Sequence, residues 1–378
     1  MIRRILQIGE KQLNIPSEVV TQADAPEISG WVSDLHDTLM HFRQEYGAGR
    51  AVSLPQIGIG KRLIYAYLDK PYVFMNPVLT FPDDERYIVR DDCMSYPGYI
   101  VEIERHKRAV LSYLDERFRR KTVFLEGDYA ELFQHEYDHL EGITIDMRAT
   151  DKNAIRQEQM TRNLDQSGFP PLREIEIRQA ETPDLDGVKA LLKANHVDNL
   201  TEAQRADGFV TTNMTDAQMQ ELSAMKTGIT IASDSGKVVA FAFAAAWEYW
   251  KQWPFFVNMI GELPKYHYPG QELSTENSYQ YGPVCVDRAY RGQGIFETLF
   301  QTSLEGMSDR FPVMVTFVNH KNPRSHAAHT KKAKMDVLGD FDYNGNSYYL
   351  IACATKRVPG TDGLFVEETE GTTEKRNA

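Results

Sequence analysis

The chain has 378 residues, of which 42% are hydrophobic and 25% are charged, and its formal net charge is -12. A chain of this length exceeds what one hydrophobic core usually serves, so two domains are expected. The composition argues against a largely disordered chain, and the acidic excess disfavours general binding to DNA, which needs clustered lysine and arginine.

The sequence gives no sign of export or of membrane insertion. Its first nine residues carry charge and then an apolar run too short for a signal peptide. The run from Val238 to Trp247 is ten residues long, whereas a membrane span needs about 20. Only three cysteines occur, Cys93, Cys285 and Cys353, so no disulfide framework is implied. We therefore expect a cytoplasmic protein with no membrane partner.

The N-terminal half combines an amphipathic helix with short strands. Apolar residues at helical spacing predict a helix over 28–45. Short β-rich runs between turn residues predict antiparallel strands, and these runs lie at 62–68, 72–75, 100–104, 109–114 and 121–124. A second helix is predicted from about 128 to 140 and is ended by Gly142. This half is thus predicted to be α+β, with one central helix against antiparallel strands.

A polar stretch and the helix-breaking run Ser-Gly-Phe-Pro-Pro at 167–171 separate the two halves. We predict domains at 1–165 and 174–356, a linker at 166–173 and a polar tail at 357–378. The charges just before the linker balance, so the segment lacks the charge expected of one that docks on RNA. A ribosome contact therefore has no support in the sequence.

The C-terminal half is predicted to be a mixed α/β domain. Alternating or buried apolar runs predict strands at 174–178, 228–233, 237–244, 279–286, 312–318 and 347–355. Helical spacing predicts a helix over 183–195. Cys285 and Cys353 fall in predicted strands and are expected to be core residues.

The sequence Gln-His-Glu-Tyr-Asp-His-Leu-Glu-Gly at 134–142 contains an H-E-x-x-H pattern, formed by His135, Glu136 and His139. On a helix, positions four apart share a face, so both imidazoles can bind one metal ion with Glu136 beside it. A catalytic site takes three protein ligands and leaves a position open for water. The rest of this half must therefore supply a third ligand.

Cys93 is the candidate third ligand and lies 42 residues before His135. A thiolate with two imidazoles suits Zn²⁺ or Fe²⁺, although a lone cysteine is more often a small buried hydrophobe. Upstream, residues 49–58 form a loop of mostly small residues that contains Gln56. A carboxamide in such a loop can donate a hydrogen bond to a developing oxyanion.

Three ordered blocks, ending in Gln56, centred on Cys93 and reading Q-H-E-x-D-H-L-x-G at 134–142, resemble the peptide deformylase family. The resemblance covers about the first 165 residues, and it includes an early strand at Ile5-Leu6-Gln7 and the run Met75-Asn76-Pro77. An ordinary zinc protease shares H-E-x-x-H, but it would want a downstream His or Glu ligand.

The resemblance implies that Cys93, His135 and His139 bind a metal ion, Fe²⁺ or else Zn²⁺ or Ni²⁺. It implies that Glu136 is general base and acid, and that Gln56 and the backbone N–H of Met94 stabilise the oxyanion. A bound metal ion lowers the pKa of water towards about 7. The implied substrate is a formylated peptide, formyl-methionyl or related, or a small formylated amine.

Several residues depart from the family pattern near the expected substrate pocket. Ala51 stands where a second glycine is usual, Ser53-Leu54 replaces Ala-Ala, Asp91-Asp92 replaces Glu-Gly, and Met94 replaces leucine. Larger side chains at Ala51 and Leu54 are expected to narrow the pocket. An alternative hypothesis is that this domain is only a metal-bearing module that binds substrate or a partner.

The run Arg291-Gly292-Gln293-Gly294-Ile295-Phe296 follows an apolar strand and opens an apolar helix. Backbone N–H groups at a helix start, made approachable by glycines, suit a pyrophosphate. Together with Asn319, Asn322, Ser325 and His329, this run resembles the GNAT acetyltransferase family over about 174–356. Phe296 departs from the family's usual Gly or Ala.

This second resemblance implies acetyl-CoA as co-substrate. Its pyrophosphate would bind the amides of Gly292 to Phe296, its pantetheine arm would run along Val284 to Val286, and Arg291 and Asn322 would also contact the cofactor. His329 falls where many members have a tyrosine that protonates the leaving thiolate. It is equally expected to be a satisfied surface histidine.

We therefore predict a bifunctional enzyme that removes a formyl group and transfers acetyl to an amine, which could be the amine just exposed. The acceptor could also be an unrelated small amine. An aromatic cluster precedes the phosphate strand and is expected to be core or a domain contact, or else to line the acceptor pocket. Its members are Trp247, Tyr249, Trp250, Trp253, Phe255 and Phe256.

Overall fold

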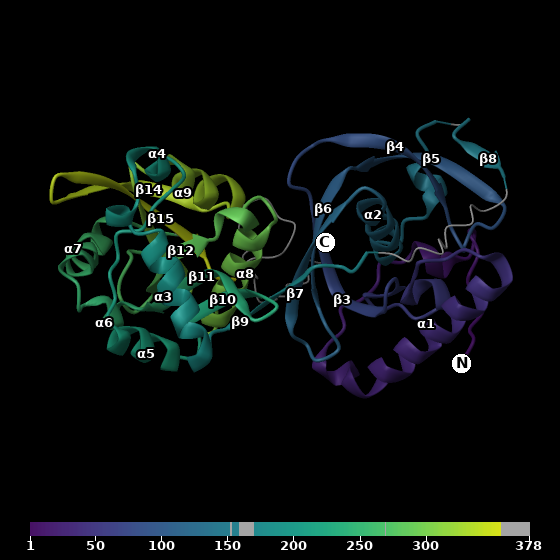
Figure 1. Ribbon diagram of the computed structural model, residues 1–378, viewed down its shortest axis with the longest axis horizontal. Coiled ribbons are helices and arrows are strands. Elements are labelled where there is room, and N and C mark those ends of the chain that lie inside the picture. The colour runs from purple at the N-terminus through teal and green to yellow at the C-terminus, as the bar shows by residue number, and fades with distance from the viewer. Residues whose placement is uncertain (152, 159–169, 269, 357–378) are drawn as a thin grey trace, which may run out of the picture. The chain divides into compact units, whose positions relative to one another are not determined.

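The computed structural model describes residues 1–151, 153–158, 170–268 and 270–356 (Figure 1). These residues form two compact units. The first contains Met1–Arg178, Ala232–Val239 and Asp287–Thr298, and the second contains Gln179–Ile231, Ala240–Val286 and the residues from Leu299 onward. Residues 166–169 of the predicted linker and the whole predicted tail at 357–378 lie outside the described residues, so the predicted domain boundaries stay a prediction.

A long helix, α1 (Ala25–Tyr46), comes first in the first unit. Pro26 stands at its start, where the missing N–H of proline costs nothing. Gly47 ends the helix with φ 67°, a left-handed conformation that glycine adopts without strain. Ile28, Leu35, Leu39 and Phe42 are buried along one face. The helix predicted over 28–45 is confirmed.

Two antiparallel sheets build the rest of the first unit. The larger has the order β1-β2-β3-β6-β7, with β9 (Glu174–Gln179) paired to β7, and the smaller has the order β4-β5-β8. The strands of the larger sheet are β1 (Ala51–Ser53), β2 (Leu63–Tyr67), β3 (Pro71–Thr80), β6 (Arg108–Leu114) and β7 (Arg120–Glu126). Those of the smaller sheet are β4 (Arg86–Asp92), β5 (Tyr99–His106) and β8 (Ile155–Gln157). The smaller sheet carries the site residues Asp91 and Arg105, which lie at the ends of β4 and β5.

The helix α2 (Asp128–Leu140) lies between strands of the two sheets (Figure 1). Phe133 and Leu140 pack with Phe74 and Leu125 of the larger sheet in one buried cluster. Gly142 follows the helix with φ 72°, and a Cβ there would lie 2.8 Å from the backbone of Asn14. The predicted helix, its bounds and its central place in an α+β unit are confirmed.

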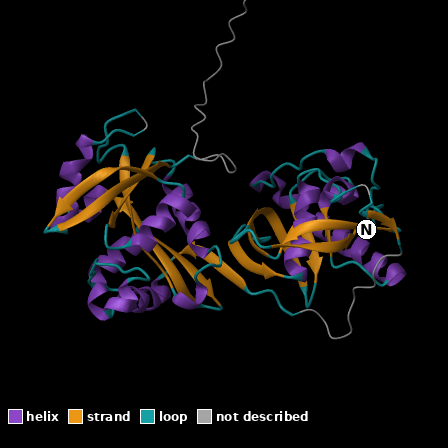
Figure 2. Ribbon diagram, turned by 90° about the horizontal axis from the view of Figure 1, so that it is seen from above, coloured by secondary structure: helices purple, strands orange, loops and turns teal. Residues whose placement is uncertain are grey.

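The C-terminal half is a sheet flanked by helices (Figure 2). Its strands are β9 (Glu174–Gln179), β10 (Ile229–Asp234), β11 (Lys237–Ala246), β12 (Ser278–Val286), β13 (Val313–Asn319), β14 (Asp336–Tyr343) and β15 (Asn346–Ala354). Its α-helices are α3 (Leu185–Ala194), α4 (Glu202–Arg205), α5 (Asp216–Ala224), α6 (Trp247–Trp250), α7 (Pro254–Glu262), α8 (Ile295–Met307) and α9 (Pro323–Ala327). The predicted mixed α/β composition is therefore observed.

The strands β12 and β13 are parallel and pair over three residues each, Ser278–Gln280 with Val313–Val315. Beyond this point β12 continues through Gly282 to Val286 alongside β11. On its other side β13 pairs with β15 along its whole length. The two parallel strands thus separate in the middle of the sheet.

Some expectations about single elements were wrong. Residues 5–7 are not a strand; instead the N–H of Leu6 donates to the carbonyl of Gln56 and the N–H of Ile8 to that of Ser95. The segment 49–58, expected to be a loop, contains strand β1 and a 3₁₀ helix, Leu54–Ile57. Strands β4 and β14 were not expected, because exposed side chains interrupt their apolar pattern. In the part of the chain that the structure describes, no helix has the length and apolarity needed to cross a membrane.

Candidate metal centre and neighbouring pocket

Helix α2 brings His135, Glu136 and His139 together in the interior of the first unit. The three residues are 6%, 2% and 1% exposed, respectively. The Nε2 atoms of the two imidazoles lie 3.3 Å apart, because the residues are one helical turn apart on the same face. The predicted H-E-x-x-H arrangement is therefore present.

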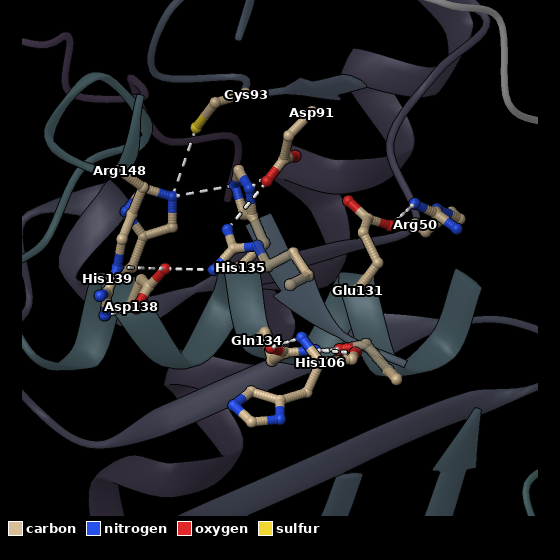
Figure 3. Close-up of polar contacts among 12 residues, drawn as sticks. Arg50, Asp91, Cys93, His106, Glu131, Gln134, His135, Asp138, His139 and Arg148 are labelled. Carbon is tan, nitrogen blue, oxygen red and sulfur yellow. Dashed lines mark hydrogen bonds and ion pairs between the residues drawn. The ribbon is translucent and has the colours of Figure 1, made fainter. Parts of the chain in front are cut away.

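Cys93 directly follows strand β4 and points at the same two imidazoles (Figure 3). Its Sγ lies 3.3 Å from Nε2 of His139. One ligand atom from each of Cys93, His135 and His139 lies within 4.8 Å of the others, and all three residues are buried. The structure thus brings together the three residues that the sequence analysis proposed as ligands.

The donor set and its spacing fit a transition-metal ion. With ligand bonds of about 2.1 Å to nitrogen and 2.3 Å to sulfur, tetrahedral geometry places ligand atoms roughly 3.4–3.6 Å apart. The two 3.3 Å separations are close to these values. Two imidazoles and a thiolate suit Fe²⁺ and Zn²⁺. Two imidazole nitrogens and a thiol sulfur that converge in the protein interior are a favourable arrangement when they share a cation.

A chain of charged side chains next to the cluster holds the His135 imidazole in place (Figure 3). Asp91 accepts from Nδ1 of His135 at 2.9 Å, which leaves Nε2 for a metal ion. Arg105 donates to Asp91 at 2.8 Å and also to Asp138. Arg148 donates to Asp138 at 2.7 Å. The chain of alternating charges fixes the tautomer and the ring plane of His135.

These charges shift the pKa values of the buried groups. Burial favours the neutral form of His135, but Asp91 and Cys93 outweigh it and raise the pKa of that imidazole. Burial and the charge of His135 lower the pKa of His139. Burial opposes ionisation of Asp91, yet His135 and Arg105 hold its pKa below the ordinary value. Burial raises the pKa of Glu136, which makes this carboxylate a better proton acceptor.

Two polar side chains, those of Gln56 and Ser53, lie beside the cluster. Gln56 is fully buried; its Oε1 accepts from the N–H of Ser53 at 2.9 Å and its Nε2 donates to the Ser95 hydroxyl at 3.3 Å. The same Nε2 lies 3.8 Å from Sγ of Cys93. Ser53 also donates to the carboxylate of Glu136. The amide donor of Gln56 is therefore held beside the cluster, where the sequence analysis expected it.

A pocket of about 400 Å³ opens next to the cluster. Gln56, Met94, His135 and Glu136 all contribute to its wall. Ala51 lines it too, as expected, but Leu54 does not. Leu54 is instead fully buried in an apolar cluster with Leu35 and Leu39 of α1, so the expectation that Leu54 narrows this pocket was wrong.

A second pocket, of about 550 Å³, lies in the second unit where β12 and β13 separate. Val284, Asn322 and His329 line it, together with Gln280 and Thr316. Nδ1 of His329 donates to the carbonyl of Ser325 at 2.8 Å, and burial lowers the pKa of this histidine to about 4. Three residues proposed from the sequence thus share one pocket.

The other residues of the proposed acetyl-CoA site do not line that pocket. Val286 is the last residue of β12. Residues 291–294 connect a short 3₁₀ helix, Arg288–Tyr290, to α8, and Ile295 and Phe296 are the first two residues of α8. Gly292 and Gly294 have φ values of 80° and 69°, which side chains rarely adopt. The predicted glycine loop at a helix start is therefore present.

Four of the six residues of the aromatic cluster are core, and the other two, Trp253 and Phe255, are half-buried. Trp247 and Trp250 are fully buried, Tyr249 and Phe256 are nearly so, and none of the six aromatic residues lines the second pocket. Cys285 and Cys353 are buried in β12 and β15, as predicted.

Sequence reasoning missed Arg105, which is 4% exposed and joins two carboxylates of the site. A signal was present, since Val101, Ile103 and Arg105 alternate along β5 and share its buried face. A cation at such a position needs a buried anion. Ser95 was missed as well, and no sequence pattern singles it out.

The α+β fold and the buried Cys-His-His cluster with an adjacent carboxylate define a metal-binding protein of the hydrolase class. Comparison with known proteins narrows this class. The family model described as polypeptide deformylase matches residues 2–154. A peptide deformylase of Dictyoglomus turgidum is 32% identical over 159 residues, which cover 42% of this chain and 99% of that protein.

Two further similarities are of the same kind in sequence. Peptide deformylase 2 of Clostridium perfringens is 33% identical over 39% of this chain and 93% of its own length. The peptide deformylase of Thermotoga maritima, known from a crystal structure, is 30% identical in sequence. The match covers 40% of this chain and 99% of the Thermotoga chain, with a TM-score of 0.37. Through its N-terminal residues, the chain belongs to the peptide deformylase family.

Proposed function

We propose that the first unit hydrolyses an N-formyl group from a peptide or a related formylated amine. The observation that carries this proposal is the meeting of a Cys-His-His cluster, a buried carboxylate and a carboxamide donor in one enclosed site. Membership of the peptide deformylase family supports it. Cys93, His135 and His139 would hold the metal ion, with Fe²⁺ as first choice and Zn²⁺ or Ni²⁺ as alternatives.

A metal ion held by these residues would supply Lewis acidity, which lowers the pKa of a bound water molecule towards neutral pH. Glu136 lies on the pocket wall beside His135, where its carboxylate can take a proton from water and return it to the departing amine. Its hydrogen bond from Ser53 aims the carboxylate. The Gln56 amide, with the backbone N–H of Met94, would donate to the oxygen that gains charge in the transition state.

We further propose that the C-terminal half transfers acetyl from acetyl-CoA to an amine, as a GNAT acetyltransferase does. Two features support this second proposal. A pocket opens where the parallel strands β12 and β13 separate, and a glycine loop with left-handed backbone precedes α8, a helix of 13 residues. Gly292 to Phe296 would bind the pyrophosphate and Val284 to Val286 the pantetheine arm, with Arg291 and Asn322 as further contacts. His329 would protonate the departing thiolate.

One experiment reads both activities. Metal-loaded protein is mixed with a formyl-methionyl peptide and acetyl-CoA, and the peptide mass is followed over time. Loss of formyl supports the first proposal, and a later gain of acetyl supports the second, with the newly exposed amine as acceptor. A peptide that loses formyl but never gains acetyl contradicts the coupling of the two reactions.

The alternative is that the first unit is a metal-bearing module that only binds substrate or a partner. This hypothesis predicts that metal-loaded protein binds a formyl peptide and leaves its mass unchanged. The Cys93→Ala variant is the matched control for either outcome, because it removes one ligand and should lower metal content along with any turnover.

A further inference from the structure

The pocket beside the metal cluster contains a buried ion pair. Arg50 and Glu131 line the pocket, and a guanidinium nitrogen of Arg50 lies 2.9 Å from a carboxylate oxygen of Glu131. Each of these side chains is only 14% exposed. Asp91 and Asp92 add further carboxylates to the wall. Apolar residues, among them Ala51, Met94 and Leu132, also line the wall, so the pocket combines an apolar lining with a buried ion pair.

Arg50 and Glu131 line the same pocket as His135 and Glu136. Glu131, His135 and His139 follow one another at intervals of four residues on α2, so they share one face of the helix. Arg50 directly precedes β1, and its guanidinium points at the carboxylate of Glu131 (Figure 3). A substrate side chain that enters this pocket next to His135 and Glu136 therefore meets Arg50 and Glu131.

One donor of the pair has no partner. The Nε of Arg50 is buried and makes no hydrogen bond with any of the residues that the structure describes. An unsatisfied buried donor costs about 1–3 kcal/mol. A ligand with an acceptor at this point would remove that cost, whereas a thioether or an alkyl chain would displace water and leave the donor unsatisfied.

The sign of the charges limits what the pocket accepts. A carboxylate could reach Arg50 but would lie near Glu131, Asp91 and Asp92, and an ammonium could reach Glu131 but would lie near Arg50. An uncharged group with both a donor and an acceptor can bond to both partners of the pair without adding net charge. A carboxamide has this property.

We propose that Arg50 and Glu131 determine specificity, so that the site selects a formylated residue with a carboxamide side chain over formyl-methionine. This inference rests on the proposed deformylation. It replaces the sequence-based expectation of a formyl-methionyl substrate with one whose side chain bonds to the buried pair.

The test compares kcat/KM of the metal-loaded full-length protein for the peptides formyl-X-Ala-Ser. X is glutamine, methionine, norleucine, lysine or glutamate. We expect glutamine to exceed each of the other four by at least 10-fold, which corresponds to about 1.4 kcal/mol. Equal or faster turnover with methionine, norleucine or either charged residue would overturn the inference while leaving deformylation intact. Turnover of none of the five would contradict deformylation itself, and the inference with it.

A double variant sharpens the test. Arg50→Ile with Glu131→Ile removes both charges together, which avoids leaving one unpaired buried ion. We expect the ratio of glutamine to methionine turnover to fall at least 10-fold and to favour methionine. The control is the double variant Arg62→Ile with Glu141→Ile. These two residues form an ion pair of 2.7 Å at the other end of α2 and do not line the pocket. The ratio of glutamine to methionine turnover in this control should stay that of the unaltered protein.

Circular dichroism and thermal unfolding establish whether each double variant is folded. A folded Arg50/Glu131 variant with an unchanged ratio contradicts the role of the pair. If that variant does not fold, the five-peptide series on the unaltered protein decides the matter alone.

Discussion

The two candidate sites are held together by different kinds of interaction. Around the metal cluster, charged groups alternate through the protein interior, from His135 to Asp91, Arg105 and Asp138. The pocket in the second unit is organised by neutral groups, such as Asn322, which donates to the carbonyl of Phe209 at 3.0 Å. A chain of buried charges depends on every member, because each ion neutralises the next. A neutral network can lose one bond at lower cost. The first site should therefore respond far more strongly to single changes than the second.

The largest effect is expected at Arg105. Arg105→Leu leaves Asp91 and Asp138 as buried carboxylates without their shared cation, and we expect the free energy of unfolding to fall by about 3–5 kcal/mol. Urea unfolding measures this loss. Arg86→Leu is the control, since Arg86 pairs with Glu104 on the exposed surface of the same sheet and should cost no more than about 1 kcal/mol. Equal losses in the two variants would show that the charge chain does not hold the site.

Glu136→Gln should abolish proton transfer without disturbing the ligands. The amide keeps the size of the carboxylate but cannot accept a proton, so we expect kcat to fall about 10³-fold. Metal content, measured by elemental analysis, should stay that of the unaltered protein. Full activity in a variant with normal metal content would rule out Glu136 as the base.

Gln56→Leu removes a donor while nearly keeping the volume. We expect kcat to fall about 10²-fold to 10³-fold with little change in KM, because the lost hydrogen bond strengthens only in the transition state. Steady-state formate release with a formyl peptide measures both constants. A rise in KM with unchanged kcat would assign Gln56 to substrate binding instead.

The smallest effect is expected at His329 in the second unit. Burial lowers its pKa to about 4 from an ordinary value of 6.5, so the unfolded chain binds a proton more readily than the folded protein does. Stability should therefore fall as the pH drops from about 6.5 towards 4, by about 2 kcal/mol between pH 7 and pH 5. His329→Asn keeps a donor for the carbonyl of Ser325 and should lose this part of the pH dependence. Denaturant unfolding of both proteins at the two pH values tests it; the same pH dependence in both would contradict it.

Much of the first site could be predicted from the sequence, because the helix fixes how its residues are spaced. The helical repeat alone places His135, Glu136 and His139 side by side. The small residues around Gln56 form a pattern that can be recognised in the sequence. Arg105 could not be assigned a role, since its two partners come from a strand and a helix that only the tertiary fold brings together. Leu54 shows the same limit: its backbone lies beside the site, but its side chain packs with α1.

The pair formed by Arg50 and Glu131 lies 81 residues apart in the sequence. Each residue alone looks like an ordinary charged surface residue, and only the fold shows that both are buried in one pocket. In the C-terminal half the glycine loop and the strands other than β14 followed from periodicity and turn residues. The pocket itself follows from the separation of β12 and β13, which no local pattern specifies.

The central claim is that the Cys-His-His cluster makes the first unit a hydrolase of formyl groups. Its most direct test is a titration of metal-free protein with Fe²⁺ in the absence of oxygen, or with Zn²⁺, in which bound metal and formate release are measured together. We predict that activity rises in proportion to bound metal and levels off at about one ion per chain. Binding of one ion per chain without formate release from any formyl peptide would contradict the claim and favour the binding-module alternative.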